Sequence, residues 1–133
     1  MSVYILDTDT CIYWLNGLES IREHVRQCGP RNLRITIVTF AELRYGAYNS
    51  HKVEENLRKL DQFLKKVKVL PLDQEVADRF GQLKTELQRQ GQIISDFDLL
   101  IASIAIRFGG TLVTKNTEHF QRVPGLHREN WAG

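Results

Sequence analysis

Three acids and one amide are the side chains in this sequence whose types and positions could do chemistry. Asp7 directly follows the apolar run at residues 3–6, and Asn116 closely follows a second run at residues 111–114. Glu42 and Asp98 lie in the first turns of two segments with helical character. Such oxygen ligands select Mg²⁺ or Mn²⁺ over Zn²⁺. If the fold brings them together, these residues predict a site for a hard divalent cation.

The elements that must position these side chains alternate between strand and helix. We expect strands at residues 3–6, 33–37, 67–70 and 111–114, with a weaker fifth near 126–128. Apolar periodicity and stop signals predict helices at 8–16, 19–27, 39–48, 54–67, 73–90 and 98–108. This alternation is typical of right-handed βαβ units around a parallel sheet, which gives an α/β fold.

A parallel sheet would place all four polar groups at one edge. Asp7 and Asn116 follow strands, and Asp98 opens a crossover helix that runs antiparallel to them, so its first turn lies at their C-terminal ends. Two carboxylates about 5 Å apart repel each other by roughly 3 kcal/mol at an effective dielectric constant near 20. Three acids at this edge would therefore need a cation or a proton.

Each of these residues also has a purely structural interpretation, as a cap of the helix or turn that begins there. The capping candidates are Asp7 or Thr8, the pair Thr39 and Glu42, the pair Ser95 and Asp98, and Asn116. A capping role and a ligand role are compatible in a first helical turn. His119 is the one histidine close to this set in the sequence, and we interpret it as a surface or packing residue.

The composition of the chain excludes some classes of protein but does not identify its function. The chain has 133 residues, the size of one ordinary domain, and its net charge of +2 is too small to indicate a polyanionic partner by itself. Cys11 and Cys28 form neither a metal-binding spacing nor a disulfide framework, which favours a cytoplasmic protein. We expect no signal peptide and no membrane-spanning segment.

Four segments, taken in order, resemble the PIN-domain ribonucleases, and in particular the VapC-type toxins of bacterial toxin–antitoxin pairs. They are residues 6–10 (LDTDT), 36–47 (TIVTFAELRYGA), 91–102 (GQIISDFDLLIA) and 112–120 (LVTKNTEHF), and the ending at 123–131 is similar too. The resemblance covers essentially the whole chain. It implies a single PIN-like domain over residues 1–133, with three α/β/α layers around a central, mostly parallel sheet of four to five strands.

The resemblance also implies a catalytic set. Asp7, Glu42 and Asp98 would bind the catalytic Mg²⁺ or Mn²⁺, and Asn116 would take the fourth position, where many PIN domains carry Asp. Further residues around this set are expected to assist it. Thr8, Thr114 and Asp96 are the accessory candidates, Asp9 is either accessory or a helix cap, and Lys115, Arg44, Lys84 and Arg89 are candidates for contacts with RNA phosphates. For these four cations, a solvated helix face is the competing interpretation.

The implied activity is that of a metal-dependent endoribonuclease toxin acting on structured RNA such as tRNA or ribosomal RNA. The implied partners are a small antitoxin that blocks the site and a second copy of the chain in a homodimer. Two other functions stay open. Asp7 could be the phosphate-accepting nucleophile of a haloacid-dehalogenase-like phosphatase, although Cys11 stands where those enzymes usually want a hydroxyl. A PIN-like scaffold could also bind RNA or protein without cutting it.

Overall fold

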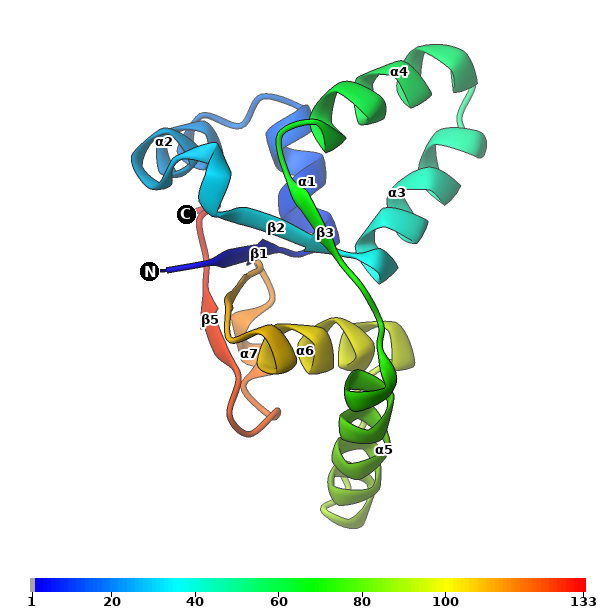
Figure 1. The fold of residues 1–133 in the computed structure, drawn as a ribbon, viewed down its shortest axis with the longest axis vertical. Helices are drawn as coiled ribbons and strands as arrows, with labels where there is room; N and C mark the ends of the chain where they lie inside the picture. The colour runs from blue at the N-terminus through cyan, green and yellow to red at the C-terminus, as the bar shows by residue number, and fades with distance from the viewer. Residues whose placement is uncertain (1) are drawn as a thin grey trace.

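A sheet of five short parallel strands forms the centre of the computed structural model, which describes residues 2–133 (Figure 1). The strands are Tyr4–Leu6 (β1), Leu33–Thr36 (β2), Lys68–Leu70 (β3), Thr111–Val113 (β4) and His127–Glu129 (β5). Their order is β3-β2-β1-β4-β5, and every neighbouring pair is parallel. The chain extends the sheet first to one side of β1 and then, from β4, to the other. Such a switch point is where open α/β sheets form binding sites.

Helices cover both faces of this sheet, so the fold has the three α/β/α layers that the resemblance implied. In Figure 1, α1 to α4 lie on one side of the sheet and α5 to α7 on the other. The helices are Thr8–Leu15 (α1), Glu19–Cys28 (α2), Ile37–Tyr48 (α3), Val53–Leu64 (α4), Gln74–Arg89 (α5), Asp96–Phe108 (α6) and Thr117–Phe120 (α7), with a 3₁₀ turn at Pro30–Asn32.

Two hydrophobic clusters, one on each face, hold the layers together. Ile5 and Leu112 point into the cluster under α5 and α6, whereas their neighbours Leu6 and Val113 point into the cluster under α1 to α4. All four side chains are fully buried. Neighbouring residues of a strand face opposite sides of a sheet. An uninterrupted apolar run is therefore what a strand buried on both faces requires.

The expected strands and helices are present, with one boundary that matters for the site. α3 begins at Ile37 rather than at residue 39, and β2 correspondingly ends at Thr36 instead of residue 37. The N-cap of α3 is Thr36, whose hydroxyl accepts a hydrogen bond from the amide of Thr39 at 3.0 Å. The interpretation of Thr39 and Glu42 as a capping box is therefore wrong, and the Glu42 side chain is available for another contact.

The other predicted cap on a site helix is present. The hydroxyl of Ser95 accepts a hydrogen bond from the amide of Asp98 at 3.3 Å and so caps α6. The helix ends in front of Gly109, which adopts the left-handed conformation (φ 73°) that glycine tolerates best. Across residues 2–133, none of the helices combines the length and the apolar character needed to traverse a lipid bilayer.

Candidate active site

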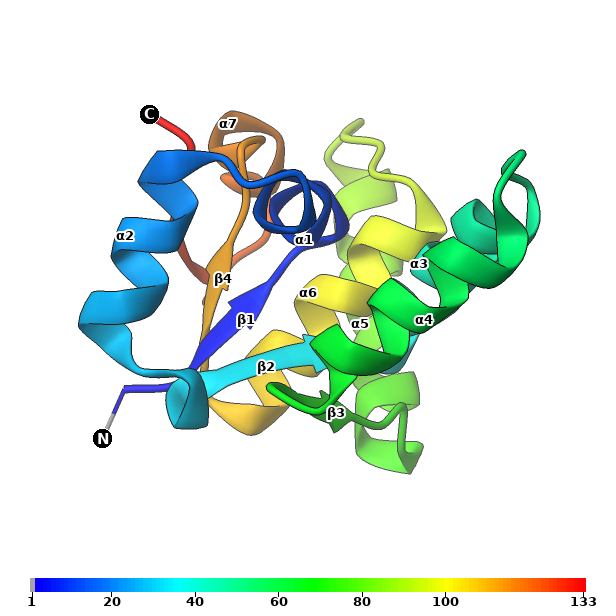
Figure 2. The same ribbon diagram turned by 90° about the horizontal axis from the view of Figure 1, so that it is seen from above.

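The site is built around Asp7, at the switch point of the sheet. Figure 2 shows α1, α7 and the start of α6 gathered beyond the C-terminal ends of β1 and β4. The backbone amide of Asp7 donates to the carbonyl of Val113, which ties the end of β1 to the end of β4. One carboxylate oxygen of Asp7 accepts from the amide of Thr8 at 2.8 Å, and the other from the hydroxyl of Thr114 at 2.8 Å. The residue is only 5% exposed, so its orientation is fixed.

Glu42 reaches the same edge from α3, where the hydroxyl of Thr8 holds it. That hydroxyl lies 2.7 Å from Oε1 of Glu42 and 3.1 Å from the hydroxyl of the buried Thr39. Since a carboxylate only accepts hydrogen bonds, Thr8 donates to Glu42. Thr8 therefore joins the first turn of α1 to α3 and sets the position of the second acid.

Asp98 enters from the first turn of α6 and is paired with His119 of α7. Nε2 of His119 lies 3.1 Å from Oδ2 of Asp98, and both side chains are about one-third exposed. His119 is thus partly exposed and packs edge-on against Phe120, as the interpretation of a surface or packing residue has it, and it also contacts an acid of the site. The sequence contained a signal for this contact, since His119 lies three residues after Asn116 and β4 delivers both to the same edge.

The electrostatics show that the acids are crowded. Burial, and next the negative charge of Asp9, raise the pKa of Asp7 to about 7, against the lowering effect of its hydrogen bonds from Thr114 and Thr8. Asp98 adds a smaller repulsion. Burial also raises the pKa of Asp9, with Asp98 again contributing. The charged form of Asp7 is therefore destabilised, and a cation beside it would offset that penalty.

The donor set fits a hard cation with few protein ligands. Within residues 2–133, no three His, Cys, Asp or Glu side chains stand close enough together to make a ready metal cage. Mg²⁺ does not require one, because it usually binds one or two carboxylates and keeps several waters. Among the three acids expected to bind the cation, Asp7 and Asp98 are the pair whose charges interact, whereas Oε1 of Glu42 already accepts from Thr8. The residues present therefore suit Mg²⁺ or Mn²⁺ with water completing its coordination.

Asn116 and Lys115 lie beside this site but are exposed. Asn116 is the N-cap residue of α7, and its side chain makes no capping hydrogen bond. Its backbone amide donates a hydrogen bond to the hydroxyl of Thr114 at 3.1 Å. Nζ of Lys115 lies 5.5 Å from the centre of the Tyr13 ring. The expected carboxamide and cation are thus at the correct edge of the sheet, both facing solvent.

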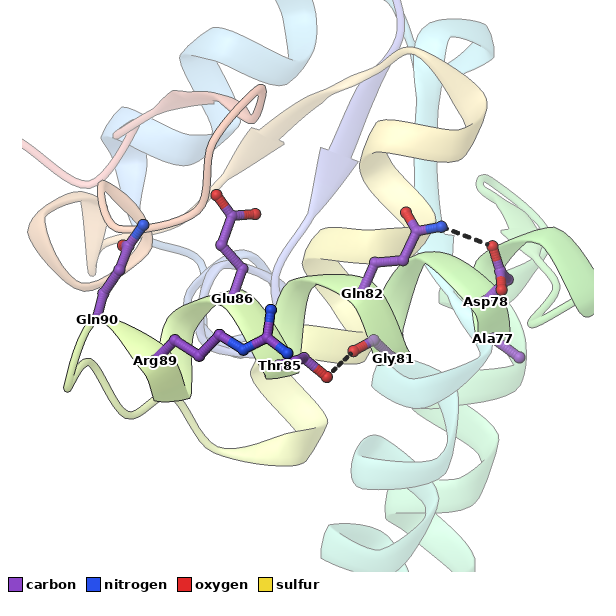
Figure 3. Close-up of a pocket in the computed structure, with 8 residues that line it drawn as sticks. All are labelled: Ala77, Asp78, Gly81, Gln82, Thr85, Glu86, Arg89 and Gln90. Atoms are coloured by element: carbon purple, nitrogen blue, oxygen red, sulfur yellow. Dashed lines mark hydrogen bonds between the residues drawn. The ribbon is translucent and has the colours of Figure 1, made fainter.

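The remaining cations that the sequence singled out lie farther along the helices. Arg44 is paired with Asp61 and Lys84 with the predicted accessory residue Asp96, each at 2.9 Å, so their charges are partly neutralised. Arg89 lines a shallow pocket on the outer face of α5, together with residues such as Thr85 (Figure 3). None of the acids of the site lines that pocket.

A groove of about 300 Å³ lies between α1, α3 and α4 on the surface of the molecule. Glu42 is the one acid of the site that lines it. Ile12 and Leu15 are 44% and 38% exposed and contribute apolar surface. Leu15 and Lys59 also line a second depression that continues toward α2. Through Glu42 the candidate active site therefore adjoins a partly apolar depression in the surface.

Comparisons with known proteins identify the family to which the chain belongs. The family model described as the PIN domain matches residues 4–126. "Ribonuclease VapC2" of Rickettsia felis is 40% identical over 131 residues, which are 97% of this chain and 98% of the relative. The "tRNA(fMet)-specific endonuclease VapC" of Shigella flexneri is 38% identical over 133 residues, 99% of this chain and 100% of the relative. A crystal structure of VapBC2 from R. felis, bound to a promoter DNA fragment, superposes with a TM-score of 0.92 at 39% identity, covering 97% of this chain and 98% of that one.

Proposed function

Since the chain belongs to the PIN-domain family, and within it to the VapC ribonucleases, we propose that it is an endoribonuclease toxin that requires Mg²⁺ or Mn²⁺ and that a small antitoxin silences. One observation carries the metal requirement. Asp7 is held at the switch point of the sheet by two hydrogen bonds, yet burial and neighbouring acids raise its pKa to about 7. A fixed carboxylate in this state gains most from a bound cation.

In this proposal the residues of the chain orient and hold the reactants. Asp7 and Asp98 bind the cation, and Glu42, fixed by Thr8, completes the acidic set around its waters. The chemistry that the cation supplies when bound is activation of a water and stabilisation of charge on the phosphoryl oxygens. The hydroxyl of Thr114 donates a hydrogen bond to Asp7 and keeps it in place. The same hydroxyl accepts a hydrogen bond from the backbone amide of Asn116 and so shapes the turn that carries this residue. Attack of water on the phosphorus leaves a 5′-phosphate and a 3′-hydroxyl.

The substrate we propose is structured RNA of the cytoplasm, and tRNA(fMet) is the first RNA to test because the S. flexneri relative is named for it. Lys115 is the cation best placed for a phosphate near the cleaved bond, since it is exposed and adjoins Asn116. Arg44 and Lys84 would have to exchange their partners Asp61 and Asp96 for RNA. We therefore assign them, and the more distant Arg89, to the outer part of the RNA-binding surface.

Neither alternative function has an observation in its favour. A phosphatase nucleophile must react as the carboxylate, but burial and neighbouring acids raise the pKa of Asp7 to about 7, which disfavours that form in the absence of a cation. Cys11 is fully buried, with its thiol directed at the carbonyl of Leu6, so it does not replace the hydroxyl of those enzymes. A non-catalytic scaffold would have no need for a buried carboxylate beside further acids, an arrangement that destabilises the charged form of Asp7.

The groove beside Glu42 is the surface that we assign to the antitoxin. Ile12 and Leu15 would cover apolar side chains of the antitoxin, and Glu42 would attract a basic side chain. For the homodimer we assign a different surface, on α3 and the α5–α6 connection. Exposed apolar residues there include Tyr45, Tyr48 and Ile93, which are 69%, 65% and 80% exposed.

The proposal is tested by replacing Asp98 with Asn and by sequencing RNA ends after brief induction of each protein. The Asp98→Asn protein should fold normally and produce no new 5′ ends, because it lacks one of the two charges that hold the cation. Asp78→Asn is the matched control, since Asp78 is an exposed acid on α5. The purified wild-type protein should cleave tRNA with Mn²⁺ and stop when a chelator is added. Cleavage by Asp98→Asn at the wild-type rate, or cleavage in chelator, would refute the proposal.

A further inference from the structure

The contact between His119 and Asp98 has a geometry that none of the predicted roles explains. An ionised carboxylate accepts hydrogen bonds and cannot donate them, so the imidazole of His119 donates from Nε2 to Oδ2 of Asp98 across 3.1 Å. The ring is fixed on its other side by Phe120, which is 1% exposed and meets it edge-on, with ring centres 5.3 Å apart. Packing against Phe120 therefore helps to keep the imidazole in contact with Asp98.

We propose that His119 is a positioning residue that orients Asp98 for the cation. Its hydrogen bond to Oδ2 restricts rotation of the carboxylate, which would hold Asp98 in one orientation for binding the cation. This inference rests on the proposed function, because His119 acts only through Asp98. Partners that hydrogen-bond to a metal ligand typically change metal affinity by about 10- to 100-fold.

The contact is not needed to build the helix terminus. Ser95 already caps α6 by accepting a hydrogen bond from the amide of Asp98, so the Asp98 side chain has no capping task. The pair is also about one-third exposed on both sides, and pairs of that kind add little to the stability of a fold. The main effect of the His119 hydrogen bond is therefore on the orientation of the Asp98 carboxylate.

His119 is distinguished from a direct metal ligand by where its nitrogen points. Nε2 faces the carboxylate, which makes the histidine an outer partner of Asp98. Nitrogen ligation would favour transition metals such as Zn²⁺, whereas oxygen ligands keep the preference for Mg²⁺ and Mn²⁺. A Mn²⁺ ion in this site should therefore be surrounded by oxygen atoms, with no directly bonded nitrogen.

Mn²⁺ binding by the full-length protein, measured by calorimetry, tests the inference. His119→Ala should bind Mn²⁺ about 10-fold or more weakly than the wild type. His119→Gln should regain most of the lost affinity, because its amide nitrogen lies the same number of bonds from the backbone as Nε2 and can donate to Asp98. His51→Ala is the matched control, since His51 is exposed in the α3–α4 connection.

Three further measurements separate positioning from other roles. Raising the Mn²⁺ concentration should restore the kcat of His119→Ala on tRNA without changing KM, which loss of structure would not allow. Pulsed electron paramagnetic resonance of bound Mn²⁺ should show no directly coordinated nitrogen in the wild type. Thermal melting of the metal-free variants should match the wild type.

The outcomes distinguish this inference from the function on which it rests. Equal Mn²⁺ affinity in wild type and His119→Ala, or a nitrogen bonded directly to Mn²⁺, would overturn the positioning role while leaving the nuclease intact. Failure of Gln to restore affinity would overturn it as well. Absence of Mn²⁺ binding by the wild-type protein, with Asp98→Asn indistinguishable from it, would refute the metal-dependent function and this inference together.

Discussion

At the scale of single residues, the site depends on hydroxyl groups as much as on acids. Thr114 and Thr8 each donate a hydrogen bond to a carboxylate, on Asp7 and Glu42 respectively. A hydroxyl can stabilise a charge without neutralising it, so the acids keep the ability to attract a cation. Burial acts in the opposite direction and dominates for Asp7, whose pKa rises to about 7. In the metal-free site Asp7 should therefore gain or lose its proton at a pH of about 7.

This balance predicts how stability depends on pH in the metal-free protein. Since the native state binds a proton at Asp7 that the unfolded chain has already released, wild-type stability should fall as pH rises from about 4 to about 7. The rise in pKa from 3.8 to about 7 corresponds to a loss of up to about 4 kcal/mol. Asp7→Asn cannot ionise, so it should be more stable than the wild type at pH 8 by a similar amount, as measured by urea unfolding in chelator.

The comparison of wild-type and Asp7→Asn stability has an internal control at low pH. At a pH well below 3.8 the carboxyl group is neutral in both the folded and the unfolded wild-type protein, so the difference in unfolding free energy between wild type and Asp7→Asn should be small there. Saturating Mg²⁺ should restore the stability of the wild type at pH 8 and leave Asp7→Asn unchanged. If the difference in unfolding free energy between wild type and Asp7→Asn is constant across this pH range, burial does not raise the pKa of Asp7.

At the scale of elements, sequence reasoning located the acids because strand ends and helix starts are local features. The apolar runs at residues 3–6 and 111–114 fix where Asp7 and Thr114 emerge, and a parallel sheet brings those ends together. Contacts between elements were not predictable in the same way. The pairing of His119 with Asp98 depends on how α7 packs against α6, and that of Arg44 with Asp61 on how α3 packs against α4. The spacing of His119 from Asn116 indicates only that both lie at the same edge of the sheet, and no spacing along the chain indicates the contact between Arg44 and Asp61.

Close packing between elements also gives a prediction for the turn that leads into β4. A side-chain carbon added at Gly110 would lie 2.6 Å from Cδ1 of Ile5 and 3.2 Å from the carbonyl oxygen of Val3. β1 runs next to β4, so neither neighbour can move without disturbing the strand that carries Asp7. Gly110→Ala should therefore lower the free energy of unfolding by about 1–3 kcal/mol, as measured by urea denaturation.

Gly81 provides the matched substitution on the exposed face of α5. A side-chain carbon there would contact nothing within 4 Å, and alanine is favoured over glycine in a helix by up to about 1 kcal/mol. Gly81→Ala should consequently unfold at the same or a higher urea concentration than the wild type. If both variants unfold like the wild type, the close approach of β1 to the turn is not a constraint on the fold.

At the scale of the whole molecule, the proposed function gives one helix, α1, a part in both catalysis and docking. The first turn of α1 carries Thr8, which holds Glu42, and the same helix presents Ile12 and Leu15 to the groove. A partner lying in that groove would therefore contact Glu42. In the proposed function, cleavage and silencing would use different side chains of α1, and a substitution should be able to separate them.

Ile12→Glu is the substitution that should separate cleavage from silencing. Ile12 is 44% exposed, so water can solvate a carboxylate there in the free protein, and cleavage of tRNA should proceed at the wild-type rate. In the complex the same carboxylate would be buried against apolar side chains at a cost of several kcal/mol. The concentration of antitoxin that halves cleavage should rise by about 100-fold or more, since each 1.4 kcal/mol is a factor of ten. Ile12→Val, which keeps the apolar surface, should be silenced like the wild type, and silencing of Ile12→Glu at the wild-type concentration would place the antitoxin on another surface.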